Sequence, residues 1–190
     1  ALTYKGWEQT QTVTSVTVDG LDVTYTVSDN VQTNAGTYTL TVTGTGNFTG
    51  TATKDWTIDP KDISNAVITL GDTLTYNGQE QTQTVTSVTV DGLSVTYDVT
   101  GNTGTDVKDY TLTITGTGNF TGTATKDWTI APKDISNAII TLGEALTYTG
   151  QEQVQTIDSV TVDDLTVTYD ASNDRGTNAG AYTLTVTGTG

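Results

Sequence analysis

Cysteine, histidine and methionine are absent from this 190-residue chain, and proline occurs only at Pro60 and Pro132. Without Cys or His, the chain can form no disulfide, no Cys or His metal site and no catalytic Cys or His. Basic residues are also few: 7 Lys and Arg stand against 22 Asp and Glu, which gives a net charge of −15. A negative field repels nucleic acids and anionic membranes, so we expect neither as a partner. The chain also contains no apolar run long enough to cross a bilayer.

Threonine dominates what is present, with 48 residues, and 20 glycines and 9 tyrosines accompany it. Thr, Val, Tyr and Trp suit a pleated, half-buried surface, whereas the long charged residues that favour helices are scarce. Apolar and threonine residues alternate along 109–116, which predicts a strand with one face in a core and the other in water. The composition therefore indicates an all-β protein.

A long repeat organises the chain. The stretch TGTGNFTGTATKDWTI at 43–58 returns without a change at 115–130, which is 72 residues later, and the segment LTY recurs with the same spacing. Such a period indicates a tandem array of one folding unit. We predict three units at 1–59, 60–131 and 132–190, of which the first lacks a first strand and the third lacks a last strand. Either the sequence is a window on a longer array, or the open edges accept a strand from another copy.

Six or seven short strands are expected in each unit. Asp91-Gly92 lies between two alternating runs, as Asp19-Gly20 does, and Asp-Gly in that position predicts a tight hairpin turn with positive φ at both residues. In the complete unit the other expected strands are 63–70, 74–76, 82–90, 93–99 and 119–130. This pattern predicts tandem immunoglobulin-like β-sandwiches. Since only one or two residues, including a proline, separate the units, we expect an elongated, semi-rigid rod.

Several motifs resemble the mostly-β, glycine-rich (MBG-type) immunoglobulin-like repeats of bacterial surface proteins. The complete unit opens with Thr-Tyr-Asn-Gly at 75–78, continues to Gly-Thr-Gly-Asn-Phe-Thr-Gly at 116–122 and closes with Trp-Thr-Ile at 128–130. The resemblance covers essentially the whole chain and implies an extracellular, cell-surface protein such as an adhesin or a long fibre. One departure is Asp-Val-Lys at 106–108, where the outer units have Asn-Ala-Gly, so we expect that turn to be built differently.

The tryptophans divide into two kinds. Trp56 and Trp128 each lie an even number of positions from nearby Phe and Ile residues, including Phe48 and Phe120, so these side chains should lie on the same side of the chain. We expect all of them to be core residues rather than a platform for sugars. Trp7 has glutamine at both of its repeat counterparts, so it is expected on the surface or at a contact between units.

Lys54 and Lys126 each lie two residues before a tryptophan, on the same face of the expected strand, which would direct their charge toward the core. One interpretation is that the lysine stem extends to solvent near a strand end or a bulge. The alternative is an isopeptide bond to Asn65 or Asn137, which would expel one ammonia.

Metal binding and catalysis receive little support. The junction carboxylates of Asp59, Asp62 and Asp134 could bind calcium, but Asp59 is replaced by Ala131 at the second junction, and a solvated acidic surface is the competing interpretation. No paired carboxylates have a glycosidase pattern. We therefore expect no enzyme, no catalytic or cofactor-binding residues and no assigned metal ligand.

Together these features predict the structural repeat region of an extracellular bacterial fibre or adhesin stalk, located at the cell surface and acting as a semi-rigid spacer. Its expected partners are neighbouring repeats of the same protein. Two alternatives stay open: a module that binds glycans or the extracellular matrix, and a filament subunit that assembles by exchanging strands.

Overall fold

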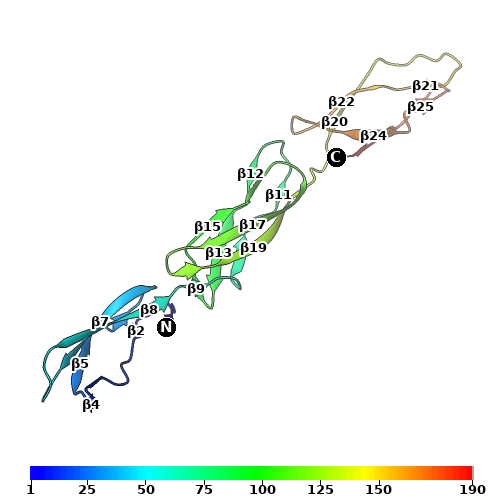
Figure 1. Ribbon diagram of the computed structural model, residues 1–190. Helices are drawn as coiled ribbons and strands as arrows, with labels where there is room; N and C mark the ends of the chain where they lie inside the picture. The colour runs from blue at the N-terminus through cyan, green and yellow to red at the C-terminus, as the bar shows by residue number, and fades with distance from the viewer. Residues whose placement is uncertain (190) are drawn as a thin grey trace. The chain divides into compact units, whose positions relative to one another are not determined.

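The computed structural model describes residues 1–189, which form strands, turns and loops without a helix (Figure 1). The expected all-β class is therefore confirmed. No helix long and apolar enough to span a membrane occurs in this range. The chain divides into two compact units: residues 1–72, 82–104 and 109–128 form the first, and residues 73–81, 105–108 and 129–190 form the second. These units do not follow the 72-residue period, so the domain boundaries at 59/60 and 131/132 stay a prediction.

Two four-stranded sheets share one topology and lie one period apart in the sequence. In each sheet a short strand pairs in parallel with the closing nine-residue strand, and the pairs β5–β7, β7–β8 and β15–β17 are antiparallel. The first sheet has the order β1 (Leu2–Thr3), β8 (Thr51–Asp59), β7 (Gly36–Gly44) and β5 (Tyr25–Ser28), and the second has β11 (Leu74–Thr75), β19 (Thr123–Ala131), β17 (Lys108–Gly116) and β15 (Tyr97–Thr100).

Smaller sheets complete the fold. Two of them are three-stranded: β10 (Val67–Leu70), β13 (Val85–Val90) and β14 (Leu93–Ser94), and their counterparts β20 (Ile139–Leu142), β22 (Ile157–Val162) and β23 (Leu165–Thr166). The two-stranded pairs are β3 (Thr17–Val18) with β4 (Leu21–Asp22), β2 (Gln9–Thr10) with β6 (Val31–Gln32), β12 (Gln81–Thr82) with β16 (Thr103–Gly104), β21 (Gln153–Val154) with β25 (Arg175–Gly176), β24 (Tyr169–Ser172) with β26 (Thr185–Gly188), and β9 (Lys61–Asp62) with β18 (Phe120–Thr121).

The hairpin prediction is confirmed in backbone detail. Asp91 and Gly92, which join β13 to β14, have φ values of 48° and 78°, and Asp19 and Gly20 have 51° and 79°. A turn with positive φ at both central residues matches the twist of the flanking strands. At the third hairpin the second turn residue is Asp164 rather than glycine, and its φ is 63°. Asp tolerates a positive φ better than most residues do.

The core follows the alternation read from the sequence. Leu112 and Ile114 on β17 are 0% exposed, whereas the threonines between and beside them are more open to water. Ile130 on β19 is also 0% exposed, and its counterpart Ile58 on β8 is 1% exposed. Burying side chains of this size stabilises each sheet by about 1.5–3 kcal/mol per residue.

One local prediction is wrong. The strand expected at 63–70 begins at Val67, because residues 63–66 form a turn in which the Ala66 N–H donates to the Ile63 carbonyl over 2.8 Å. The turn at 106–108 has the same sequence of bends and strands as the turn before β7, but the backbone differs at the residue where the strand begins: Gly36 has a φ of 158°, and Lys108 has no positive φ.

Candidate functional site at the repeat junction

Pro60 marks the point where the chain changes hydrogen-bonding partners. Before it, the Asp59 carbonyl accepts a hydrogen bond from the Tyr4 N–H over 2.9 Å, within the sheet of β8. After it, the Lys61 N–H donates to the Asn119 carbonyl over 2.9 Å, and β9 pairs in parallel with β18. Proline has no N–H to pair and a restricted φ. The chain therefore passes from one hydrogen-bonded strand to the next with one residue between them.

The Asn119 side chain connects the two repeats that meet here. Its carboxamide oxygen accepts a hydrogen bond from the Ala35 N–H over 2.8 Å, and its NH₂ group donates to the Asn34 side-chain oxygen over 3.1 Å. All three residues belong to the first compact unit. The Asn-Ala segment before β7 is thereby held against the Gly-Asn-Phe turn that lies 84 residues further along the chain.

The opening motif and the aromatic tract also meet at this junction. The rings of Tyr4 and Phe120 lie edge to face with centroids 5.4 Å apart, and Phe120 is 5% exposed. Two residues after Tyr4, a Cβ added at Gly6 would lie 2.6 Å from the Leu93 side chain, so glycine leaves the room that this leucine occupies. The same close approach recurs in the second compact unit, where a Cβ added at Gly78 would lie 2.7 Å from the Leu165 side chain. The Thr-Tyr-x-Gly and Gly-Asn-Phe motifs are therefore junction motifs.

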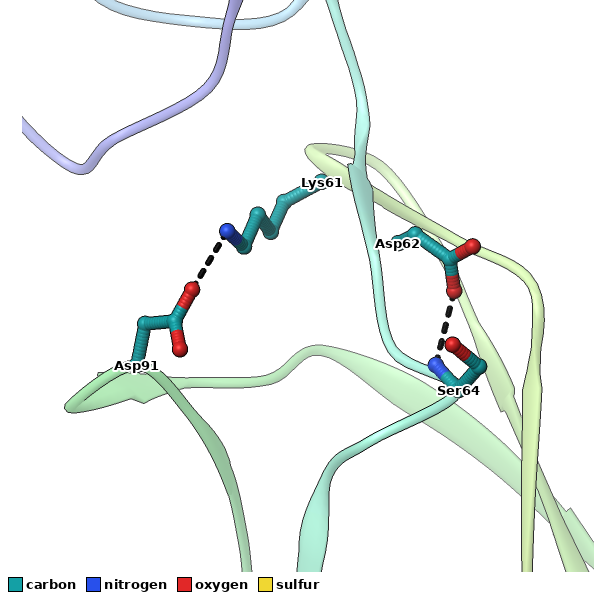
Figure 2. Close-up of polar contacts among 4 residues, drawn as sticks. All are labelled: Lys61, Asp62, Ser64 and Asp91. Carbon is teal, nitrogen blue, oxygen red and sulfur yellow. Dashed lines mark hydrogen bonds and ion pairs between the residues drawn. The ribbon is translucent and has the colours of Figure 1, made fainter.

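An ion pair ties the entering chain to the hairpin turn of its own repeat. Figure 2 shows the Lys61 ammonium directed at the carboxylate of Asp91, the residue that opens the β13–β14 turn. Lys133 and Asp163 form the same pair one period later. Since the Asp91 side chain is 71% exposed, the pair contributes only about 0–1 kcal/mol. Its main effect is to orient the segment that follows the proline.

A short side-chain cap follows each ion pair. The Asp62 carboxylate accepts the Ser64 N–H over 2.7 Å (Figure 2), and Asp134 accepts the Ser136 N–H over 2.8 Å and the Ser136 hydroxyl over 3.1 Å. These contacts close the turn that delays the first strand. Because hydrogen bonds from the Ser136 backbone and then from its hydroxyl favour the charged form, the pKa of Asp134 is lowered from its ordinary value of 3.8.

We predict a corresponding pH dependence. A pKa lowered in the folded state means that this cap stabilises the turn above pH 3.8 and is lost as the pH falls through the lower folded value. A carbon-detected NMR titration of the Asp134 carboxyl should give a midpoint below 3.8, with the Ser136 amide shift following the same curve. Ser136→Ala should raise the midpoint only in part, because the backbone donor remains. A midpoint at or above 3.8 would contradict the assignment.

The tryptophan predictions are confirmed, and one phenylalanine differs from expectation. Trp56 and Trp128 are 6% and 5% exposed, whereas Trp7 is 61% exposed. Phe120 is buried as expected, but Phe48, inside the same 16-residue sequence, is only half-buried. Phe120 packs on Tyr4 and lies on a strand that pairs with β9, whereas Phe48 lies outside a strand.

The lysine and carboxylate candidates lie in solvent. Lys54 and Lys126 are exposed although they share the parity of the core residues, and Asn65 is exposed as well. The exposed ammonium groups agree with a stem that reaches water and give no support to an isopeptide bond. Asp59, Asp62 and Asp134 are exposed too, and within residues 1–189 no three acidic side chains come together in a way that could hold a metal ion.

The junction contacts were missed at the level of sequence, although a pattern for one of them is present. Lys61 precedes Asp91 by the same 30 residues that separate Lys133 from Asp163, and each lysine follows a proline directly. A charge pair kept at constant spacing between two units could have been noticed. The hydrogen bonds of Asn119 to Asn34 and Ala35 had no such sequence pattern, because these partners lie in the preceding repeat.

Comparison with known proteins agrees with this repeat organisation. The family model described as the MBG domain matches residues 1–62 and again residues 66–134. The chain belongs to the MBG domain family. No curated protein and no solved structure matches it. Tandem MBG repeats indicate the repeat region of a surface protein, in agreement with the resemblance noted in the sequence.

Proposed function

We propose that this MBG repeat region is a non-catalytic, semi-rigid spacer in the stalk of an extracellular bacterial fibre or adhesin, built from immunoglobulin-like units. The observation that carries the proposal is the passage through Pro60, where one residue separates a hydrogen bond of the first sheet from a hydrogen bond of the next. A linker of this length leaves few free backbone dihedrals, in contrast to a flexible Gly and Ser linker.

The side chains around Pro60 support the same role. The Asn119 bridge, the Tyr4–Phe120 contact and the Lys61–Asp91 pair each restrain the segment from a different side. A spacer needs a reproducible distance between its ends more than any single surface. Near-identical copies of one unit meet that need, and the exposed threonine faces and negative charge keep such copies from associating through their sheet edges.

The proposal is tested by the width of a distance distribution. Because the chain has no cysteine, spin labels can be placed at Thr43→Cys and Thr115→Cys, two exposed sites one period apart. Electron paramagnetic resonance should then report one narrow distance in the 190-residue chain. Inserting Gly-Ser-Gly-Ser between Pro60 and Lys61 should broaden the distribution at least twofold.

Asp91→Asn is the matched control, because Asn also tolerates positive φ while the charge pair is lost. It should leave the distribution narrow, since the backbone and aromatic contacts persist. A distribution in the parent chain as broad as that of the insertion variant would refute the spacer role.

A further inference from the structure

The second opening motif contains the one Asn-Gly pair of the chain, at Asn77 and Gly78. The counterparts of Asn77 in the other repeats are Lys5 and Thr149, and each is followed by glycine. The fold accounts for the glycine, because Gly78 has a φ of 75° and a Cβ there would lie 2.7 Å from the Leu165 side chain. Asparagine is not required at the position before it, since Lys and Thr occupy that position elsewhere. The Asn-Gly pair is therefore specific to the junction between the second and third repeats.

An Asn-Gly pair can modify itself without an enzyme. The backbone nitrogen of the residue after asparagine attacks the side-chain carbonyl carbon, Cγ, and a cyclic succinimide forms as ammonia leaves. Water then opens the ring at either of its two carbonyl carbons, which gives aspartate or isoaspartate. Glycine in the second position accelerates the first step, because it has no Cβ to hinder the attack and its backbone is less restricted. Either product carries a new carboxylate, and isoaspartate also inserts a methylene into the main chain.

The local geometry brings the reacting groups of this pair together. The Asn77 side-chain oxygen accepts a hydrogen bond from the Gln79 N–H over 2.9 Å. The ring of atoms that this bond closes contains both Asn77 Cγ and the Gly78 nitrogen, so the carboxamide is folded back over the peptide group that attacks it. The same N–H points at the oxygen that becomes negative during the attack, as a donor in an oxyanion hole does. The turn therefore favours formation of the succinimide.

Both reacting groups are also accessible. Asn77 is exposed and lies outside any strand. Within residues 1–189 the Gly78 N–H makes no backbone hydrogen bond, so the attacking nitrogen is not held in a sheet. Asn65 is exposed in a turn as well, but it precedes Ala66, which carries a Cβ. Asn65 thus provides an internal reference for the same reaction.

The pair lies between two contacts with the third repeat. One residue before it, the Tyr76 N–H donates to the Ala131 carbonyl over 2.9 Å. Its second residue, Gly78, leaves the room that the Leu165 side chain occupies. All four residues belong to the second compact unit. A methylene inserted at position 77 changes the spacing between these contacts, so both cannot keep their present geometry.

We propose that Asn77-Gly78 is a site of spontaneous isoaspartate formation, and that the conversion loosens the contact between the second and third repeats. The Gly78 nitrogen forms a bond to Asn77 Cγ, its proton leaves with the carboxamide nitrogen as ammonia, and one water molecule opens the succinimide. The reaction involves no oxidation or reduction and needs no reactant other than water. It marks the age of the chain at one junction, while the first junction, with Lys5 at this position, stays unmodified. This site does not depend on the spacer role.

The reaction is tested by incubating the 190-residue chain in neutral buffer and treating samples with hydroxylamine, which cleaves a chain at a succinimide. Cleavage should occur between residues 77 and 78, and electron-transfer mass spectrometry should locate isoaspartate at 77. Asn65 should react at least tenfold more slowly, and Asn77→Thr, which installs the residue of the third repeat, should abolish the cleavage. Asn77 in the folded chain should react at least as fast as in a synthetic peptide of residues 72–84. A slower reaction in the folded chain, or equal rates at Asn77 and Asn65, would overturn the proposal.

Amide hydrogen exchange in the aged chain measures the structural consequence. The Tyr76 amide should lose protection, whereas the Tyr4 amide, which donates to the Asp59 carbonyl at the first junction, should keep it. Asn77→Asp is the matched control, because it adds the charge without the methylene and keeps an acceptor for the Gln79 N–H. This variant should leave the Tyr76 amide protected. Retained protection in the isoaspartate form, or lost protection in Asn77→Asp, would show that the inserted methylene does not loosen the junction.

Discussion

Phe120→Ala should destabilise the second repeat by about 3–5 kcal/mol, whereas Phe48→Ala should cost no more than about 2 kcal/mol. Both residues lie in the same 16-residue sequence, so local propensity is identical for the two substitutions. Phe120 is 5% exposed and packs edge to face on Tyr4, while Phe48 is half-buried. The difference in cost therefore measures the junction alone.

Amide hydrogen exchange followed by NMR gives a local measurement. The Lys61 and Ile63 N–H groups donate to the carbonyls of Asn119 and Thr121, next to Phe120. In Phe120→Ala these two amides should lose protection first, while amides in β5 and β7 keep theirs. Should the two phenylalanine variants show equal losses, the assignment of Phe120 to the junction would be wrong.

Trp128→Ala is expected to have the other large effect, a loss of about 3–5 kcal/mol from the second repeat. The indole is 5% exposed and stacks on Tyr110, so its removal leaves a cavity beside the Tyr110 ring. It also leaves the Gly101 carbonyl without the indole N–H, which adds a penalty of about 1–3 kcal/mol to the extent that water does not replace it.

Two further variants separate these contributions. Trp128→Phe keeps a ring on Tyr110 and removes the N–H donor, so it should cost about 1–3 kcal/mol. Trp7→Gln, which installs the residue found at both repeat counterparts, should change stability by less than about 0.5 kcal/mol, because Trp7 is 61% exposed. Denaturant unfolding together with exchange of the β17 amides measures all three variants. A loss from Trp7→Gln as large as that from Trp128→Ala would contradict this account of the core.

These two predictions concern different parts of one repeat. Trp128 packs on Tyr110 of its own repeat, whereas Phe120 packs on Tyr4 of the preceding repeat. The motifs by which MBG repeats are recognised thus serve both purposes. Trp-Thr-Ile closes a core, and Thr-Tyr-x-Gly with Gly-Asn-Phe forms the contact between successive units.

Several features could be predicted from sequence because their causes are local. The Asp91-Gly92 turn depends on the backbone freedom of two adjacent residues, and the buried face of β17 follows from alternation with a period of two. The start of β10 was missed even though its cause is also local, since an Asp two residues before a Ser is a known way to close a turn.

Other features depended on tertiary structure. Phe48 and Phe120 have identical neighbours in sequence yet differ in burial, and Lys126 shares the parity of Trp128 yet is exposed. The Lys61–Asp91 and Asn34–Asn119 contacts join residues that are 30 and 85 positions apart. By itself, the sequence determined the repeat, the β class, the turns and the inward faces, because backbone dihedrals and alternation are properties of adjacent residues. Only the tertiary structure decided which of those faces is covered, because burial depends on the segment that packs against it.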